Sequence, residues 1–410
     1  MNTERPMVIV GAGHVGGRAA QALREAGYAG RLVMIGAEPH RPYERPPLSK
    51  ALLTGEQDAA QCALRPESAW ADDRVEHLIA RVASIDPAAR ELVLADGRRL
   101  GYAALLLATG GHLRRLSIPG ADAPGVLGLR TLDDAAALAP RLVPGARLVI
   151  VGGGFIGLEV AASARARGCE VTVIEGAPRL LGRAVPESVG VHVLALHRAR
   201  GVTVELGVAP VAIAARDDGR LAVQLADGRE QLADTVVVGV GIEPATELAR
   251  AAGLAVNRGV LVDAELQTSA PGVYAAGDVA EFPSRCTGEP IRQETWHNAE
   301  TQARTAARNM LGAHEPYADC PWFWSDQYDH QLQVAGEPAL GATRITRALG
   351  EAAEVHFHVD ASGRVVGVSG FGPVSAVARE LKLARMLVER NAHPDPAALA
   401  DPGVKLKSLL

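Results

Sequence analysis

Cysteine is scarce in this sequence of 410 residues, and its four cysteines lie far apart. Cys62, Cys169, Cys286 and Cys320 form neither a C-x-x-C nor a C-x4-C pair. A redox dithiol, a structural zinc site and an iron–sulfur cluster each need closely spaced thiolates. We therefore expect buried, inert thiols and no cysteine-based redox centre or cluster.

Long apolar runs are also absent. The longest, ALLLATG and TVVVGVG, are far shorter than the roughly 20 residues that a membrane-spanning helix requires. A strand-like segment begins almost at the N-terminus, and nothing before it resembles a signal sequence. We therefore expect a cytoplasmic protein without a membrane partner.

An excess of basic residues is missing as well, since the formal net charge is −5. A protein that binds nucleic acid needs a basic surface to contact phosphates, so we expect no nucleic-acid partner. The chain does have length and apolar content, with 48% hydrophobic residues. This is enough for two or three domains, each with its own core.

The segment MVIVGAGHVGGRAAQALREAG reads as a buried strand, a tight turn and a helix. Gly11, Gly13 and Gly16 match the G-x-G-x-x-G pattern. The first glycine permits the turn, the second lets the backbone approach a pyrophosphate, and the third lets the helix pack on the strand. The next run, RLVMIGAE, brings Glu38 22 residues after Gly16, where a carboxylate can bind a ribose hydroxyl. The segment predicts a dinucleotide site.

A second segment, RLVIVGGGFIGLEVAASARARGCEVTVIE, follows the same pattern. Gly152, Gly154 and Gly157 occupy the loop positions, and Glu175 ends the following strand. Two complete strand–turn–helix–strand–acid units are much rarer by chance than one. The alternative is one working site and one decayed copy.

The similarity between the two halves extends beyond the loops. LADGRRLGYAALLLATG and LADGREQLADTVVVGVG both have an Asp-Gly turn followed by an apolar strand that ends in glycine. The spacing is 14 positions from Asp96 to Gly110 and 14 from Asp227 to Gly241. We infer an internal duplication of a dinucleotide-binding domain. Two dinucleotides in one chain are typical of a flavin that takes electrons from a nicotinamide.

Several further segments carry a resemblance to a known family: PYERPPLSK, LRTLDDA, YAAGDVA, ETWHNAETQA and PWFWSDQYDHQLQVAG. With the two glycine loops, they make the chain similar to the two-dinucleotide-fold flavoprotein reductases, above all to the ferredoxin reductases of bacterial oxygenase systems. The resemblance implies an α/β fold with two Rossmann-like domains, for FAD and NAD, and a C-terminal α+β interface domain. It places the FAD domain at residues 1–113 and 243–319, the NAD domain at 114–242 and the C-terminal domain at 320–410.

The resemblance also implies which residues bind the cofactors. Those expected on the FAD side are Gly11, Gly13, Gly16, Glu38, Arg45, Lys50, Ala108, Thr109, Gly110, Arg130, Asp278 and Trp296. Those expected on the NAD side are Gly152, Gly154, Phe155, Ile156, Gly157, Glu159, Glu175, Gly239 and Gly241. Asp278 resembles the aspartate that binds the ribityl chain, although on its own it reads equally well as a turn residue.

Three of the expected residues concern catalysis. By the resemblance, Lys50 lies beside the hydride-accepting flavin nitrogen and is paired with Glu159, while Trp324 stacks near the nicotinamide and the flavin. Without the resemblance, Lys50 reads as a solvated surface charge, and Trp324 with Trp322 as core aromatics. Relatives that reduce disulfides, peroxide or oxygen carry cysteine near Lys50, but RPYERPPLSKALLTG has none. Electrons therefore leave the flavin directly.

The nicotinamide is expected to be NADH. A carboxylate at the position of Glu175 accepts hydrogen bonds from ribose hydroxyls and repels the 2′-phosphate of NADPH. Arg179 follows in GAPR, but beyond a turn. We expect NADH to be preferred by at least about tenfold in kcat/KM.

The C-terminal part changes pattern after Cys320. The runs EVHFHVD and RVVGVSGFG predict strands of an antiparallel sheet, and VSAVARELKLARMLVER predicts a helix that covers one side of it. Four histidines, His297, His330, His356 and His358, lack the spacing of a metal site, so no metal is expected.

Together with the resemblance, the sequence predicts an NADH-dependent reductase; the resemblance implies that it passes single electrons to a two-iron two-sulfur ferredoxin, which in turn feeds a cytochrome P-450 or a ring-hydroxylating dioxygenase. The alternatives are a rubredoxin reductase, an NADH oxidase, or a redox-controlled interaction protein similar to apoptosis-inducing factor. We expect a monomer or a weak homodimer. Candidates for docking an acidic ferredoxin are Arg65, Arg304, Arg308, Lys382 and Arg385, each of which also reads as an ordinary surface charge. Departures from the family pattern are His112, Leu113, Glu243 and Ala245.

Overall fold

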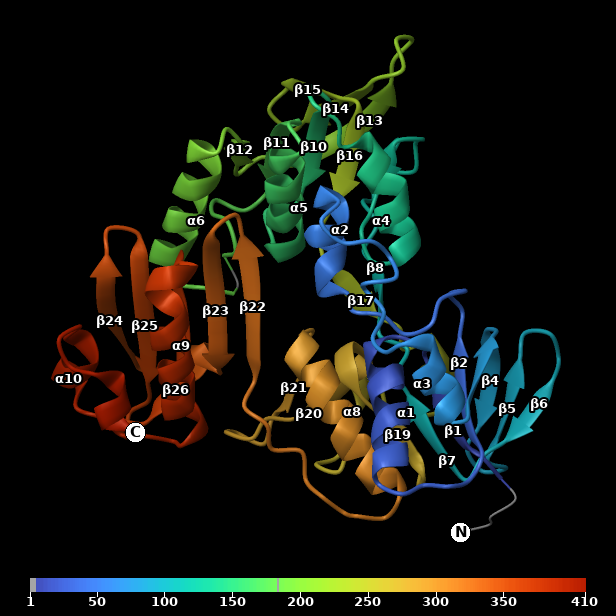
Figure 1. Ribbon diagram of the computed structural model, residues 1–410. Coiled ribbons are helices and arrows are strands. Elements are labelled where there is room, and N and C mark those ends of the chain that lie inside the picture. Colours follow the sequence, from blue (N-terminus) through green and yellow to red (C-terminus); the bar gives the residue numbers. More distant parts are fainter. Residues whose placement is uncertain (1–4, 183) are drawn as a thin grey trace. The chain divides into compact units, whose positions relative to one another are not determined.

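The computed structural model describes residues 5–182 and 184–410 (Figure 1). The chain forms two compact units, each assembled from separate stretches of sequence. Unit 1 consists of Met1–Arg45, Ala59–His112 and Ile242–Asp319. Unit 2 consists of Pro46–Asp58, Leu113–Gly241 and Cys320–Leu410.

The centre of unit 1 is a five-stranded parallel sheet with strand order β19-β7-β1-β2-β3. Its strands are β1 (Met7–Val10), β2 (Leu32–Gly36), β3 (Val75–Ile79), β7 (Ala104–Leu107) and β19 (Val273–Ala275). Four of them are continuous apolar runs buried along their whole length, as in sheets covered on both faces. The predicted α/β fold with parallel sheets is confirmed.

Two helices of unit 1 pack side by side, α1 (His14–Glu25) and α8 (Trp296–Met310) (Figure 1). Their facing surfaces consist largely of alanine and glycine, including Ala20 and Ala303, which lets the two backbones approach closely. The other elements of unit 1 are short: α3 (Glu67–Asp72), β4 (Val82–Asp86), β5 (Glu91–Leu94), β6 (Arg99–Gly101), β17 (Ile242–Pro244), α7 (Glu247–Ala251), β18 (Val260–Leu261), η3 (Gly277–Val279), β20 (Ala280–Pro283) and β21 (Pro290–Ile291). The strand β8 (Gly111–Leu113), paired with β17, ends at the boundary of the unit.

Unit 2 contains a second five-stranded parallel sheet, with strand order β12-β11-β10-β16-β9. Its strands are β9 (Val126–Leu127), β10 (Arg147–Val151), β11 (Glu170–Glu175), β12 (Thr203–Leu206) and β16 (Thr235–Val238). The helices that accompany it are α4 (Leu132–Leu138), η2 (Ala139–Arg141), α5 (Phe155–Ala166) and α6 (Glu187–Ala199). A small antiparallel sheet is formed by β13 (Pro210–Ala215), β14 (Leu221–Leu225) and β15 (Glu230–Ala233).

The inferred duplication is visible in the strand orders. The strands β3-β2-β1-β7 correspond to β12-β11-β10-β16, and each of these sheets is accompanied by a three-stranded antiparallel sheet. Both Asp-Gly turns have the same geometry, since Gly97 and Gly228 each have φ of +87°. In both, the aspartate accepts a hydrogen bond from the backbone two residues later. The fifth strand differs: β19 comes from far downstream, whereas β9 comes from upstream.

The stretch that follows Arg45 folds with unit 2, although its neighbours on both sides belong to unit 1. It forms the 3-10 helix η1 (Pro46–Ser49) and the short helix α2 (Ala51–Thr54). Both pack against α5, the helix that follows the second glycine loop. Lys50 lies between them, so the structure places this lysine with the second nucleotide loop.

The C-terminal part of unit 2 is a five-stranded antiparallel sheet with order β22-β23-β26-β25-β24, drawn in orange to red (Figure 1). Its strands are β22 (Trp322–Gln327), β23 (His330–Gly336), β24 (Thr343–Gly350), β25 (Ala353–Val359) and β26 (Val365–Pro373). Helix α9 (Val374–Glu389) packs on the sheet through Leu381 and Leu387, next to Phe357. The two strands and the helix predicted here are confirmed. The remaining elements are η4 (Pro338–Leu340), α10 (Pro396–Ala400) and η5 (Leu406–Leu409).

A buried arginine connects this sheet to the last stretch of the chain. Arg347 on β24 is only 1% exposed. Its guanidinium donates hydrogen bonds to the carbonyl oxygens of Leu399, Asp401, Pro402 and Val404. A carboxylate on α9 lies 3.0 Å from the arginine Nε and balances the charge. These hydrogen bonds therefore fix the C-terminal residues to the sheet.

Candidate functional site

The first glycine loop has the backbone geometry that the motif predicts. Gly11 has φ of +117°, and a Cβ there would lie 2.0 Å from the carbonyl oxygen of Ala108. A Cβ on Gly16 would lie 1.9 Å from the Gly11 oxygen, so α1 can pack this closely only without a side chain. Gly13 has open space instead, because the atom nearest to a Cβ there would be Arg45 Nη2, at 3.6 Å. The backbone at Gly13 is therefore accessible to an approaching pyrophosphate.

The other residues expected to bind FAD in unit 1 collect at the carboxyl edge of the same sheet. Residues Ala108, Thr109 and Gly110 follow β7, and Asp278 follows β19. The Thr109 hydroxyl donates to the carbonyl of Ala245 at 2.9 Å, which fixes this turn. Ligands of open α/β sheets bind at this edge. The structure thus brings together residues from distant parts of the chain.

Glu38 lies beyond the end of β2, where the ribose-binding acid was expected. Its Oε1 is 3.2 Å from Arg45 Nη2, and the Tyr43 hydroxyl donates to its other oxygen. The guanidinium of Arg45 also lies over the Tyr43 ring, 5.3 Å from its centre. Arg45 is therefore held between the acid and the open backbone at Gly13, close to where phosphates are expected.

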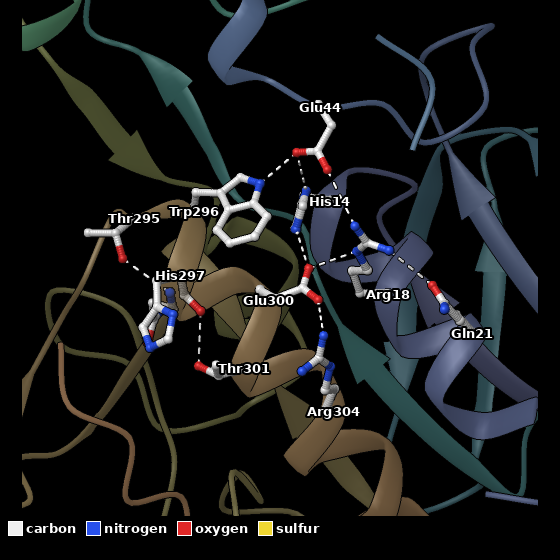
Figure 2. A network of polar contacts seen from close by, with 11 residues as sticks. His14, Arg18, Gln21, Glu44, Thr295, Trp296, His297, Glu300, Thr301 and Arg304 are labelled. Atoms are coloured by element: carbon white, nitrogen blue, oxygen red, sulfur yellow. Dashed lines mark hydrogen bonds and ion pairs between the residues drawn. The ribbon is translucent and has the colours of Figure 1, made fainter. Parts of the chain in front are cut away.

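A network of charged side chains connects α1 to α8 beside the first loop (Figure 2). His14, the residue after Gly13, has its Nε2 2.9 Å from Glu300 and its Nδ1 3.3 Å from Glu44. The Trp296 indole donates to Glu44 at 2.5 Å. Arg18 and Arg304 complete the network through Glu300. Of these residues Trp296 was expected to bind FAD and Arg304 to dock a ferredoxin; the others had no sequence signal, because each is an ordinary helix or loop residue by pattern.

The network raises the pKa of its histidine. Burial alone lowers the pKa of His14, but the contacts with Glu300 and Glu44 outweigh burial, so its pKa is raised. Burial raises the pKa of Glu44, but His14, Trp296 and Arg18 outweigh it, and the pKa of Glu44 is lowered. The pKa of Glu300 is lowered in the same way, against burial, by His14, Arg18 and Arg304. His14 therefore bridges two carboxylates directly behind the first loop.

The second loop repeats the glycine geometry of the first. A Cβ on Gly157 would lie 2.1 Å from the Gly152 oxygen, and one on Gly152 would lie 2.5 Å from the Gly239 oxygen. No atom lies within 4 Å of the place that a Cβ on Gly154 would occupy, so the backbone is open there too. Gly241 follows β16 with φ of +101°. The predicted loop residues are therefore gathered at the carboxyl edge of this sheet.

Glu175 ends β11 with both carboxylate oxygens anchored. They accept hydrogen bonds from the backbone N–H groups of Gly153 and Ala177, each at 2.7 Å. Each oxygen retains a second lone pair for a ligand. Arg179 is occupied elsewhere, because its guanidinium donates to the carbonyls of Gly182 and Val185. The loop thus offers a fixed carboxylate and an arginine that is already engaged.

The other residues predicted around the NAD loop have varied surroundings. The Phe155 ring meets the Phe323 ring edge-on, with centres 5.0 Å apart. The next residue, Ile156, is 45% exposed. Arg130, expected on the FAD side, belongs to unit 2, where its backbone N–H donates to Asp134 at the start of α4.

Lys50 and Glu159 are brought together, with Nζ and Oε1 3.1 Å apart. Glu159 is 5% exposed, whereas Lys50 is 25% exposed. Two serines that the sequence did not point to, Ser49 and Ser325, donate to the same carboxylate. Ser325 follows Trp324 on β22. The Trp324 ring stacks on the Trp322 ring with centres 5.0 Å apart, and its indole N–H donates to Asp326.

The cationic residues expected to dock a ferredoxin mostly have acidic neighbours within the chain. Arg304 pairs with Glu300, and Arg308 with Glu315 at 3.0 Å. The remaining two arginines follow the same rule: Arg65 pairs with Asp73 at 2.5 Å and Arg385 with Glu389 at 3.1 Å. Lys382 is exposed on α9. Their net contribution to a positive surface is smaller than the sequence suggests.

The histidines considered as metal ligands make ordinary hydrogen bonds. His356 contacts Ser188 and Thr346, and His358 contacts Ser369 at 3.1 Å. Within residues 5–182 and 184–410, no group of three or more His, Cys, Asp or Glu side chains is arranged to hold a metal ion. In the same part of the chain, every helix is too short or too polar to cross a bilayer.

Comparison with known proteins gives consistent matches over the whole chain. The description "Pyridine nucleotide-disulphide oxidoreductase" matches residues 5–303, and "Reductase C-terminal" matches residues 322–410. The anthranilate 1,2-dioxygenase system ferredoxin–NAD(+) reductase component of Burkholderia cepacia is 45% identical over 414 residues, covering 99% of each chain.

Two solved structures are similar throughout. The ferredoxin reductase for the CYP199A2 system from Rhodopseudomonas palustris superposes with a TM-score of 0.91 at 40% identity, covering 98% of this chain and 99% of the other. The covalent putidaredoxin reductase–putidaredoxin complex superposes with a TM-score of 0.93 at 34% identity, covering 100% and 98%. The first family description covers residues 5–303, and the Burkholderia cepacia relative covers 99% of the chain. The chain therefore belongs to the pyridine nucleotide-disulphide oxidoreductase family, in the group of ferredoxin reductases that carry the Reductase C-terminal domain.

Proposed function

We propose that this oxidoreductase takes hydride from NADH on a bound FAD and passes single electrons to a two-iron two-sulfur ferredoxin. The observation that carries the proposal is the pair of complete dinucleotide loops, each with an open central glycine and an acid at the end of the next strand. When bound, FAD supplies the conversion of a two-electron donor into a one-electron donor. The family membership and the names of the relatives support the same function.

Unit 1 is proposed to bind FAD. The backbone at Gly13 and the N-terminus of α1 receive the pyrophosphate, Arg45 neutralises its charge and Glu38 accepts from the ribose. Asp278 accepts from the ribityl hydroxyls. The open space at Gly13 fits a pyrophosphate, because a side chain there would occupy its path.

Unit 2 is proposed to bind NADH through the loop that contains Gly154. Glu175 accepts hydrogen bonds from the adenosine ribose and disfavours a 2′-phosphate by charge repulsion. Arg179 does not offset this repulsion, since the carbonyls of Gly182 and Val185 hold its guanidinium. The preference for NADH over NADPH follows from these two residues.

Lys50, Glu159 and Trp324 are proposed to act at the reacting end of the cofactors. The Lys50 ammonium stabilises negative charge that develops on the flavin ring, and Glu159 compensates the ammonium. Trp324 orients the nicotinamide by stacking. Because the sequence around Lys50 has no cysteine, no thiol takes electrons from the flavin, and the acceptor is an external one-electron carrier.

The names of the relatives indicate the acceptor's setting. One relative is a component of a dioxygenase system, and one solved structure joins a reductase to putidaredoxin. We propose that this chain feeds a cytochrome P-450 or a ring-hydroxylating dioxygenase in the cytoplasm, as a monomer or weak homodimer. Lys382 and the docking arginines would steer an acidic ferredoxin.

The test is reconstitution with purified components. The protein should bind FAD, oxidise NADH, and reduce cytochrome c only when a two-iron two-sulfur ferredoxin is added. Added salt should slow this rate, because charges steer the encounter. Rapid NADH consumption with oxygen alone would indicate an oxidase, and transfer to rubredoxin but not to ferredoxin a rubredoxin reductase. A slowly reduced flavin with no protein acceptor would indicate a redox-controlled interaction protein.

A further inference from the structure

The Lys50–Glu159 ion pair is part of a larger buried network within unit 2. The Glu159 carboxylate accepts from Ser49 Oγ at 2.5 Å on one oxygen and from Ser325 Oγ at 2.6 Å on the other. Lys50 Nζ lies 3.1 Å from the oxygen that Ser325 also uses. Ser49 and Ser325 are 2% and 0% exposed, so neither hydroxyl has water as an alternative partner. We call these two serines the hydroxyl clamp.

Both serines of the clamp are oriented by further buried groups. Gln327 Nε2 donates to Ser325 Oγ at 3.3 Å, and His197 Nε2 lies 2.9 Å from the Gln327 oxygen. The Ser49 carbonyl accepts from the Ser163 hydroxyl at 2.7 Å. Because Ser325 accepts from Gln327, its own proton points to the carboxylate. Successive donors therefore run in one direction and end on Glu159.

The clamp joins three separate segments of sequence. Ser49 ends η1, Glu159 lies on α5 behind the second glycine loop, and Ser325 is on β22 next to Trp324. These are the segments that supply the three proposed catalytic side chains. A purely structural contact here would be formed most cheaply by apolar side chains, since buried polar groups must each find a partner.

Lysine itself is rare in this chain. The sequence contains four lysines, Lys50, Lys382, Lys405 and Lys407, against 38 arginines, so Lys50 is the one lysine among the first 381 residues. Arginine would form a rigid two-point contact with a carboxylate, whereas lysine carries a compact charge on a flexible stem. A lysine partner is one that can move away from Glu159.

We propose that Ser49 and Ser325 are positioning residues that keep the Glu159 carboxylate fixed and hydrogen-bonded without Lys50, so that the ammonium is free to leave it during the reaction. The inference rests on the proposed function of Lys50. With only Lys50 as partner, the buried carboxylate would lose its compensation each time the ammonium moved. With the clamp, two hydrogen bonds remain, and the ammonium is shared between Glu159 and its target.

Lys50 reactivity tests this directly in the holoenzyme, without turnover. Acetic anhydride labelling followed by peptide mass spectrometry measures each lysine separately, and the exposed Lys382, Lys405 and Lys407 serve as internal references. In the double variant S49A/S325A the Glu159 carboxylate loses both serine donors, so the Lys50 ammonium is more firmly bound as its partner. Labelling of Lys50 should therefore slow by at least about threefold. In an E159Q background the same two substitutions should change nothing. S369A, which removes another fully buried hydroxyl from the same antiparallel sheet, should label like the wild type.

The kinetic counterpart is flavin reduction by NADH in stopped flow. S49A/S325A should slow the reduction step by at least about threefold while KM for NADH stays within about twofold, because the serines act through Glu159 and not on the nucleotide. If the double variant does not fold, S325C, which keeps the shape of the side chain at a slightly larger volume and weakens the donor, takes its place with the same expectation.

Three results would overturn the inference: Lys50 labelling that is unchanged or faster in the double variant, equal slowing in S369A, or equal slowing in the E159Q background. None of them depends on the acceptor. A wild type that binds no FAD or reduces no ferredoxin would instead contradict the proposed function, and the labelling would still report on the clamp.

Discussion

The two nucleotide loops share a backbone and differ in what lies behind it. Aligned on their glycines, His14 corresponds to Phe155, and Arg18 to Glu159. In unit 1 the helix after the loop carries cations that join the network of Figure 2. In unit 2 the same helix positions carry an aromatic ring and a buried carboxylate. Duplication thus preserved the glycines, which fix the backbone, while the helix positions diverged, with opposite charges at Arg18 and Glu159.

The comparison separates the residues that any dinucleotide requires from those that are specific to one cofactor. The glycines are required wherever a pyrophosphate approaches a strand–helix turn, so both copies keep them. The charged residues one turn further along have no such common requirement. Breaking one copy at a time should therefore separate FAD binding from NADH use.

The largest effect is expected at the third glycine of each loop. In G157A the new Cβ would lie 2.1 Å from the Gly152 oxygen, so the second loop must shift, at a cost of about 3 kcal/mol. KM for NADH should rise roughly a hundredfold while FAD stays bound. G16A should do the reverse and release FAD. Flavin absorbance after gel filtration, with KM for NADH, distinguishes the two; loss of FAD from G157A would contradict the assignment of the loops.

The next effect concerns the charged partner of Glu159, and Arg18, which occupies the same helix position after the first loop. K50M removes the cation that pairs with Glu159, and flavin reduction by NADH should slow by about tenfold or more, because the charge on the reduced ring loses its stabilisation. R18M, at the helix position that corresponds to Glu159, should leave that step nearly unchanged. Stopped-flow traces of flavin bleaching are the measurement. Identical traces for K50M and the wild type would remove Lys50 from the mechanism.

The two strand-end acids, Glu38 and Glu175, should differ in their effect on the choice between NADH and NADPH. In E175A the repulsion of the 2′-phosphate is lost, and the preference for NADH over NADPH in kcat/KM should fall by about tenfold, roughly 1.4 kcal/mol. E38A should change FAD retention but not this ratio. Steady-state rates with both nucleotides provide the test, and a wild type that uses NADPH as well as NADH would show that Glu175 does not select.

The smallest effect is a pH dependence confined to unit 1. Because the pKa of His14 is raised, its contribution to stability is complete below the ordinary histidine pKa of about 6.5 and is lost as pH rises through the raised value. The pKa values of Glu44 and Glu300 are lowered, so their contributions are complete above about 4.3 and are lost as pH falls. The network therefore stabilises unit 1 most between about pH 4.3 and 6.5.

H14Q should lack the alkaline part of this dependence. Between pH 6 and pH 9 the wild type should lose about 1 kcal/mol of unfolding free energy more than H14Q does. Urea unfolding of the holoprotein at both pH values measures it. H358Q should act in the opposite direction: burial lowers the pKa of His358 to about 4, so near pH 6 only the unfolded chain takes up this proton, and H358Q should lose more unfolding free energy between pH 6 and pH 9 than the wild type does. A parallel pH dependence in H14Q and the wild type would show that the pKa of His14 is not raised in the folded protein.

Sequence reasoning was sufficient where backbone conformation decides. Gly11 and Gly152 have positive φ, and the two Asp-Gly turns repeat with equal geometry, because few residues other than glycine fit these positions. The same reasoning located the two strands and the helix of the C-terminal domain from their apolar patterns.

Sequence reasoning failed where a residue's hydrogen-bond or ion-pair partner is distant in sequence and the residue type is common. His14 and Glu300 are 286 positions apart, and Glu159 and Ser325 are 166 apart. A serine in a loop or strand is usually unremarkable by pattern, so the hydroxyl clamp has no local signal. The docking arginines are a different case: Glu300 and Glu315 lie only four and seven residues from Arg304 and Arg308, so the helical spacing of Glu300 and Arg304 was already a signal for that pair.

The late arrival of β19 has a consequence for how the protein is made. The strand pairs with β7, yet the whole parallel sheet of unit 2 is encoded between the two. At about 5–20 residues per second, β7 waits on the order of ten seconds on the ribosome with one edge open. Unit 2's parallel sheet can therefore be complete before that of unit 1, and the nascent chain should acquire protease resistance around Gly154 earlier than around Gly13.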